Sequence, residues 1–187
     1  MISGSHILFS KIIYEYCTNK LNIKLNRGVF MYGNIKPDIS KECKQNEHSV
    51  EDSADIVKVY YAKLTSGELE NREFSLILGM MCHYICDFFC IFHTKEYVKK
   101  NSFVHTLYEI RLHMVFIARL LGGKIKITKF KNLPYHDIET IISVMRERYF
   151  KEIPSFTRDI NNALEAAIWS VESAVYYRKA EEDAQAL

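Results

Sequence analysis

The sequence is poor in the residues that break regular structure and has almost no excess charge. Only 7 glycines and 3 prolines occur in 187 residues, which excludes a collagen-like repeat and argues against a turn-dense all-β fold. The 25 Lys and Arg residues nearly balance the 23 Asp and Glu residues, so the composition does not indicate a nucleic-acid-binding surface. Hydrophobic residues make up 48% of the chain, which excludes disorder and is enough for a buried core. We expect one domain over residues 1–187.

A secretory signal and a disulfide framework are also missing. The first residues, MISGSHILFSKIIYEYC, lack the basic, apolar and small regions of a signal peptide in that order. The five cysteines are an odd number, and three of them (Cys82, Cys86 and Cys90) fall in one apolar segment. We interpret these three as packing residues, because free cysteine is among the most buried residue types. These features predict a cytoplasmic protein in a reducing compartment.

The longest apolar run, from Phe74 to Phe92, would be long enough to span a bilayer. However, His83 and Asp87 interrupt its centre. An ionised aspartate in the middle of a bilayer costs about 2.5–3.5 kcal/mol, so we interpret the run as a buried helix and predict no transmembrane segment.

Apolar residues recur at helical spacing along most of the chain. The expected helices cover residues 5–19, 50–65, 71–91, 103–121, 137–149 and 155–179. We expect residues 22–40 to be irregular, because Gly28, Gly33 and Pro37 interrupt them. The alternating basic and apolar residues from Lys124 to Lys131 predict a short strand or an extended arm. The predicted fold is therefore an all-α, single-domain bundle of six or seven helices.

Ionisable residues with the spacing of one helical turn occur in two neighbouring helices. His83 and Asp87 are four residues apart in the apolar helix, and His105 and Glu109 repeat that spacing in the next one. His93 lies between the two pairs, and we expect the two helices to pack antiparallel. Imidazole nitrogens and carboxylate oxygens are typical zinc ligands. The pattern favours either a metal site or a set of hydrogen-bonded core residues, and the spacing alone does not separate these interpretations.

The order of these residues resembles the zinc-dependent phospholipase C family, which is related to the P1/S1-type nucleases. The resemblance covers residues 6–109 and is carried by His6, the segment GNIKPD at 33–38, His48, His83-x3-Asp87, His93 and His105-x3-Glu109. It implies an all-helical fold and a zinc-dependent phosphodiester hydrolase of the phospholipase C type that uses metal-activated water.

The resemblance also implies a ligand set for each metal. The first zinc would be held by Asp38, His48, His83 and Asp87, and the second by His93, His105 and Glu109. The third would take His6 and Asp87, and in the family an N-terminal tryptophan completes it. Only five residues precede His6 here and none is tryptophan. We therefore expect two complete zinc sites and a third with too few ligands, with Asp38 as the catalytic base that orients the water.

The sequence indicates the substrate less specifically than it indicates the metal ligands. We expect a phosphodiester, with phospholipid as one candidate, and no specific nucleic-acid partner. The family's choline-binding positions hold Ile39 and Gln45-Asn46-Glu47 here, so they do not predict an aromatic cage. Three alternatives remain: a P1-type nuclease, a metal-stabilised helical interaction or sensor module without catalysis, and an HD-type phosphohydrolase that uses His136-Asp137. The HD-type alternative is the least favoured of the three, because a role as N-cap of the following helix already explains Asp137.

Overall fold

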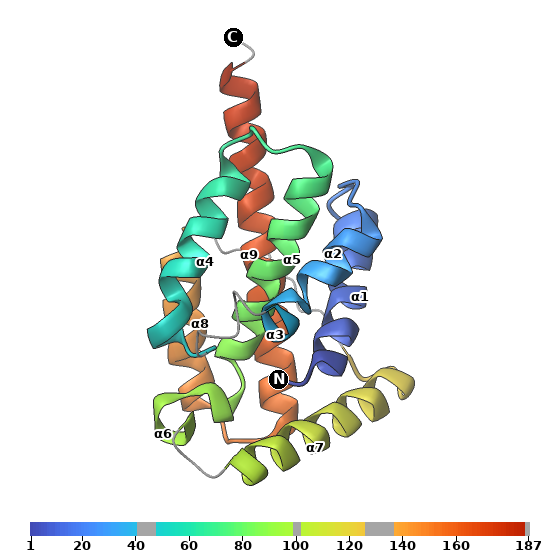
Figure 1. Cartoon of the computed structure of the whole chain (residues 1–187), viewed down its shortest axis with the longest axis vertical. Helices are drawn as coiled ribbons and strands as arrows, with labels where there is room; N and C mark the ends of the chain where they lie inside the picture. The colour runs from blue at the N-terminus through green and yellow to red at the C-terminus, as the bar shows by residue number, and fades with distance from the viewer. Residues whose placement is uncertain (41–47, 99–101, 126–136, 186–187) are drawn as a thin grey trace.

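The computed structural model describes residues 1–40, 48–98, 102–125 and 137–185, and these residues form helices and no strands. The predicted all-α fold is confirmed (Figure 1). The helices are α1 (Ser3–Asn19), α2 (Arg27–Gly33), α3 (Lys36–Ile39), α4 (Val50–Thr65), α5 (Asn71–Phe88), the 3-10 helix η1 (Ile91–His93), α6 (Lys95–Val98), α7 (Ser102–Leu121), α8 (Ile138–Lys151) and α9 (Phe156–Gln185).

Helix α5 forms the centre of the bundle. All residues from Phe74 to Cys90 except Leu76 are buried, as the long apolar run predicts. Helices α2, α4 and α9 pack directly against α5, and Figure 1 shows α5 and α9 running together along the long axis. His83 and Asp87 therefore lie inside the molecule rather than on its surface.

The expectation of an irregular segment over residues 22–40 is wrong where the short helices α2 and α3 form, but no long helix forms there, as Gly28, Gly33 and Pro37 indicate. The side chain of Asn26 accepts a hydrogen bond from the Val29 amide, 3.2 Å away, and so caps α2. Gly33 is the last residue of α2 and also lets this helix approach α5. A Cβ atom at Gly33 would lie 2.5 Å from the Leu76 carbonyl oxygen, and one at Gly79 would clash with the backbone of α2.

Most of the other predicted helices are confirmed to within a few residues. The Ser49 hydroxyl accepts a hydrogen bond from the Asp52 amide (3.2 Å) and caps α4 as its sequence indicates. Helix α5 ends at Phe88 rather than at Ile91, because the chain turns there into η1. Of the predicted strand or arm, Lys126 to Lys131 lies outside the described residues.

Helix α7 lies across one end of the bundle, and the expected antiparallel packing along α5 is wrong (Figure 1). It packs against α9 and α1 instead. The chain reaches this position through η1 and α6, which carry it around the end of α5. In the described residues, no helix has both the length and the apolar character needed to cross a membrane.

Candidate metal centre

The eight residues implied as metal ligands come from six parts of the chain, and the structure brings all of them together. His6 lies on α1, Asp38 on α3, His48 just before α4, His83 and Asp87 on α5, His93 on η1, and His105 and Glu109 on α7. The antiparallel packing used to place His93 near α7 is absent, but the turn through η1 brings it there by another route.

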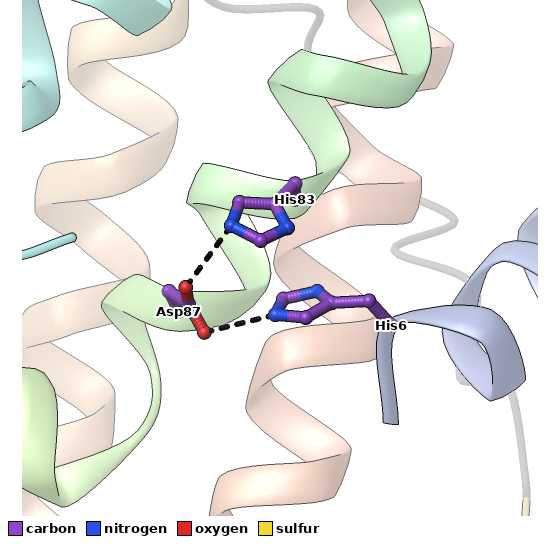
Figure 2. Close-up of side chains that lie close together, drawn as sticks. All are labelled: His6, His83 and Asp87. Carbon is purple, nitrogen blue, oxygen red and sulfur yellow. Dashed lines mark ion pairs between the residues drawn. The ribbon is translucent and has the colours of Figure 1, made fainter. Parts of the chain in front are cut away.

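The carboxylate of Asp87 lies at the centre of the cluster. Its Oδ1 is 3.2 Å from His6 Nε2 and forms an ion pair with the main-chain nitrogen of Met1. Its Oδ2 is 2.7 Å from His48 Nδ1 and 3.3 Å from His83 Nε2. Figure 2 shows the rings of His6 and His83 approaching opposite oxygens of this carboxylate from α1 and α5. Asp87 therefore joins the donors on either side of it.

Asp38, His48 and His83 form one group of donors beside Asp87. The Oδ1 atom of Asp38 lies 3.6 Å from His83 Nε2 and 3.9 Å from His48 Nδ1. These two ring nitrogens are 3.1 Å apart. The hydroxyl of Ser3 donates a hydrogen bond of 2.8 Å to Asp38 Oδ2, so the first turn of α1 holds the side chain on α3 in place.

Glu109 organises a second group around α7. Its Oε1 lies 2.9 Å from His93 Nε2 and 2.9 Å from His105 Nε2. The Met1 nitrogen is 3.1 Å from the same oxygen. Burial alone would raise the pKa of Glu109. The positively charged amino group of Met1 and hydrogen bonds from His105 and His93 instead hold this pKa below its ordinary range. The Glu109 carboxylate is therefore ionised near neutral pH and can accept a cation.

The cluster has a closed floor and a more open rim. The side chains of His6, His83 and Asp87 are fully buried, whereas those of Asp38 and His105 are 20% and 30% exposed. A soluble ligand would therefore meet Asp38 and His105 before it reached Asp87.

The donors present fit a zinc centre. Neither ring nitrogen of His6 makes a hydrogen bond within the described part of the chain, although both are buried. Burial and the nearby His6 lower the pKa of His83 well below its ordinary value, so its ring is neutral and can offer a lone pair. In the described residues, His6 Nε2 has the 3.2 Å ion-pair contact with Asp87 but no hydrogen bond. A buried polar atom without a hydrogen bond is costly, and a cation bound between these rings and Asp87 would offset that cost at Nε2.

A buried network that no sequence pattern indicates supports the second group of donors. The Asp159 carboxylate on α9 accepts hydrogen bonds from the Ile91 amide (3.0 Å), the Tyr108 hydroxyl (2.8 Å) and the Tyr149 hydroxyl (2.9 Å). It also pairs with the Arg158 guanidinium (2.9 Å). Ile91 lies two residues before His93 and Tyr108 lies next to Glu109, so this network fixes both segments relative to α9. No spacing rule links Asp159 to either segment.

The HD-type alternative rests on a residue with a structural role. Asp137 Oδ1 accepts a hydrogen bond of 2.9 Å from the Thr140 amide and caps α8, as the sequence indicates. His136 lies outside the described residues.

Comparison with known families agrees with this geometry. The family model for zinc-dependent phospholipase C matches residues 5–173, which include all eight residues of the cluster. Searches of the curated proteins and of the solved structures gave no match. Since the matched region covers most of the sequence, the chain belongs to the zinc-dependent phospholipase C family.

Proposed function

We propose that this protein is a zinc-dependent phosphodiester hydrolase of the phospholipase C type. One observation carries the proposal: overlapping groups of histidine and carboxylate donors lie close enough to share cations. The ligand atoms of Asp38, His48 and His83 lie within 4.8 Å of one another, and so do those of His6, His83 and Asp87. Family membership supports the same chemistry.

We assign the first zinc to Asp38, His48, His83 and Asp87, and the second to His93, His105 and Glu109. A third would use His6 and Asp87. When bound, zinc acts as a Lewis acid toward phosphate oxygens and lowers the pKa of water. The side chains contribute by position: Asp87 holds the donors on its two sides at a fixed separation, and the buried rings of His6 and His83 keep bulk water from the floor.

Asp38 is the residue that we assign as the base. It lies at the more exposed rim, where it can contact both the substrate and the attacking water. Its Oδ1 faces His48 and His83, which leaves Oδ2 to accept the proton of that water. The hydrogen bond from Ser3 keeps Oδ2 in a single orientation. The reaction needs no nucleophilic side chain, because water attacks the phosphorus directly.

Zinc analysis and hydrolysis assays on purified protein test the proposal. We expect about two or more zinc ions per chain by analogy with multi-metal phosphoesterases, and hydrolysis of both bis-p-nitrophenyl phosphate and phosphatidylcholine. Asp38→Asn should lower kcat by about 10²–10⁴-fold, which is the usual contribution of a general base. Glu172→Gln is the matched control, since this carboxylate pairs with Tyr16 away from the cluster and its loss should leave kcat unchanged.

The outcomes separate the competing functions. Cleavage of single-stranded DNA without turnover of phosphatidylcholine would replace the phospholipase assignment with a nuclease. Fully metallated protein that hydrolyses none of the three substrates would overturn the enzyme proposal in favour of a metal-stabilised module.

A further inference from the structure

Cys90 lies at the turn between the two groups of metal-binding residues. Its amide donates a hydrogen bond of 3.0 Å to the Asp87 carbonyl, and its own carbonyl accepts one of 2.9 Å from the His93 amide. The backbone therefore fixes Cys90 between Asp87 and His93. Its side chain is fully buried.

The thiol of Cys90 faces the second group of donors. Its Sγ, a ring nitrogen of His93 and a carboxylate oxygen of Glu109 all lie within 4.8 Å of one another. A sulfur and a nitrogen bound to one zinc ion can be no more than about 4.4 Å apart, given bond lengths of about 2.3 and 2.1 Å. Small movements are enough to bring all three atoms to bonding distance of a single cation.

The other cysteines of α5 have different surroundings. The Cys86 thiol points to the Ala163 carbonyl oxygen, 3.9 Å away on α9. The Cys82 thiol has the thiols of Cys86 and Cys17 as its neighbours. The Cys90 thiol makes no hydrogen bond within the described part of the chain, and the charged groups near it are the Met1 amino group and the carboxylates of Asp159, Glu109 and Asp87. Only Cys90 of the three combines an unused thiol with neighbouring metal-binding residues.

We propose that Cys90 is a thiolate ligand of the zinc ion that His93 and Glu109 hold. The proposal rests on the metal centre assigned above and extends it. Metal binding displaces the thiol proton to solvent. A sulfur donor makes this site selective for zinc or cobalt over magnesium or calcium, which prefer oxygen. His105 Nε2 lies 2.9 Å from Glu109 Oε1 and would be the fourth protein donor to this cation.

Cobalt substitution tests this ligand directly. The Co²⁺-loaded wild-type protein should show a near-ultraviolet thiolate-to-cobalt charge-transfer band. Cys90→Ser should abolish the band and weaken metal binding at this site by at least about tenfold, the lower end of the effect of losing outer-shell partners. Cys82→Ser and Cys86→Ser are the matched controls and should keep the band. A wild-type protein without the band, or a Cys90→Ser variant that retains it, would overturn the proposal.

X-ray absorption at the zinc edge tests the same ligand without a variant. The wild-type protein should show a sulfur shell at about 2.3 Å, and a spectrum with nitrogen and oxygen shells alone would contradict the proposal. Hydrolysis of bis-p-nitrophenyl phosphate is measured in parallel. Sulfur ligation without hydrolysis would reject the enzyme function and keep the Cys90 ligand, whereas hydrolysis without sulfur ligation would do the reverse.

Discussion

The Nδ1 atom of His83 lies 2.8 Å from the main-chain carbonyl oxygen of Asn34. A carbonyl oxygen only accepts hydrogen bonds, so this nitrogen must carry the proton of the neutral ring. The lone pair is then on Nε2, the atom that faces Asp38 and Asp87. A contact between α5 and the end of α2 thus turns the lone pair of His83 toward the cluster, as the proposed metal site requires.

The zinc-free protein should lose stability as the pH falls below about 6.5. Burial lowers the pKa of both His83 and His93 in the folded state, whereas the unfolded chain takes up these protons near pH 6.5. The unfolded state therefore binds more protons below that pH. Each imidazole then lowers the free energy of unfolding by up to about 1.4 kcal/mol per pH unit. Urea unfolding at pH 7.5 and 5.5 measures the effect. His83→Asn should reduce the dependence of the unfolding free energy on pH. An unfolding free energy that rises toward pH 5.5 would contradict the lowered pKa of these imidazoles.

Asp87→Asn should weaken metal retention by at least about tenfold. The carboxylate contacts donors on both sides, and an amide offers only one oxygen to them. Zinc content after dialysis against a chelator is the measurement. Cys86→Ser is the control, because its side chain is on the same helix turn but points to α9. Equal losses in the two variants would mean that the metal-binding face of α5 is misassigned.

Asp159→Asn should selectively weaken zinc binding by His93 and Glu109. The amide cannot accept all of the hydrogen bonds that Asp159 receives, and it leaves the charge of Arg158 buried without its partner. Breaking a buried pair in this way costs about 3–5 kcal/mol of folding free energy. Stepwise removal of zinc with chelators of increasing affinity, alongside urea unfolding, measures both effects. If the Asp38 site lost its metal to the same extent, the positioning role of Asp159 would be rejected.

Changes at Asp137 should affect α8 but not the metal. Asp137→Ala removes the N-cap and should cost about 1 kcal/mol, whereas Asp137→Asn keeps a capping oxygen and should be nearly neutral. Thermal unfolding measures the stability of each variant, and zinc analysis should give wild-type content for both. A loss of zinc in Asp137→Asn would instead support the HD-type alternative.

The sequence predicted the parts of this structure that depend on local pattern. The buried helix and the cap at Ser49 follow from apolar periodicity and capping residues, and both are confirmed. The short helices in segment 22–40 are not predicted, because glycine and proline residues indicate an irregular segment there. Gly33 does end α2, but it also permits a close contact with α5. Local rules cannot show that another backbone approaches a glycine at the end of a helix.

The candidate site was likewise predicted where it depends on local spacing and not where it depends on helix packing. The spacing of His83 with Asp87 and of His105 with Glu109 indicated two donor pairs, and the family resemblance added His6, Asp38 and His48. The structure brings these residues together, His105 through its 2.9 Å contact with Glu109. It also adds Asn34, Ser3 and Asp159, which act through main-chain groups or through residues distant in sequence. Their roles depend on helix packing, so no motif of a few residues could predict them.

The contact between Gly33 and Gly79 has a consequence beyond packing. Gly33 immediately precedes Asn34, and Gly79 lies one turn before His83. The separation of the α2 and α5 backbones at these glycines therefore determines the distance between the Asn34 carbonyl oxygen and His83 Nδ1. One extra methyl group at either glycine would push the two backbones apart and let the ring rotate. The cluster would then keep every donor atom but lose their relative geometry, because of a substitution at a residue that has no donor group.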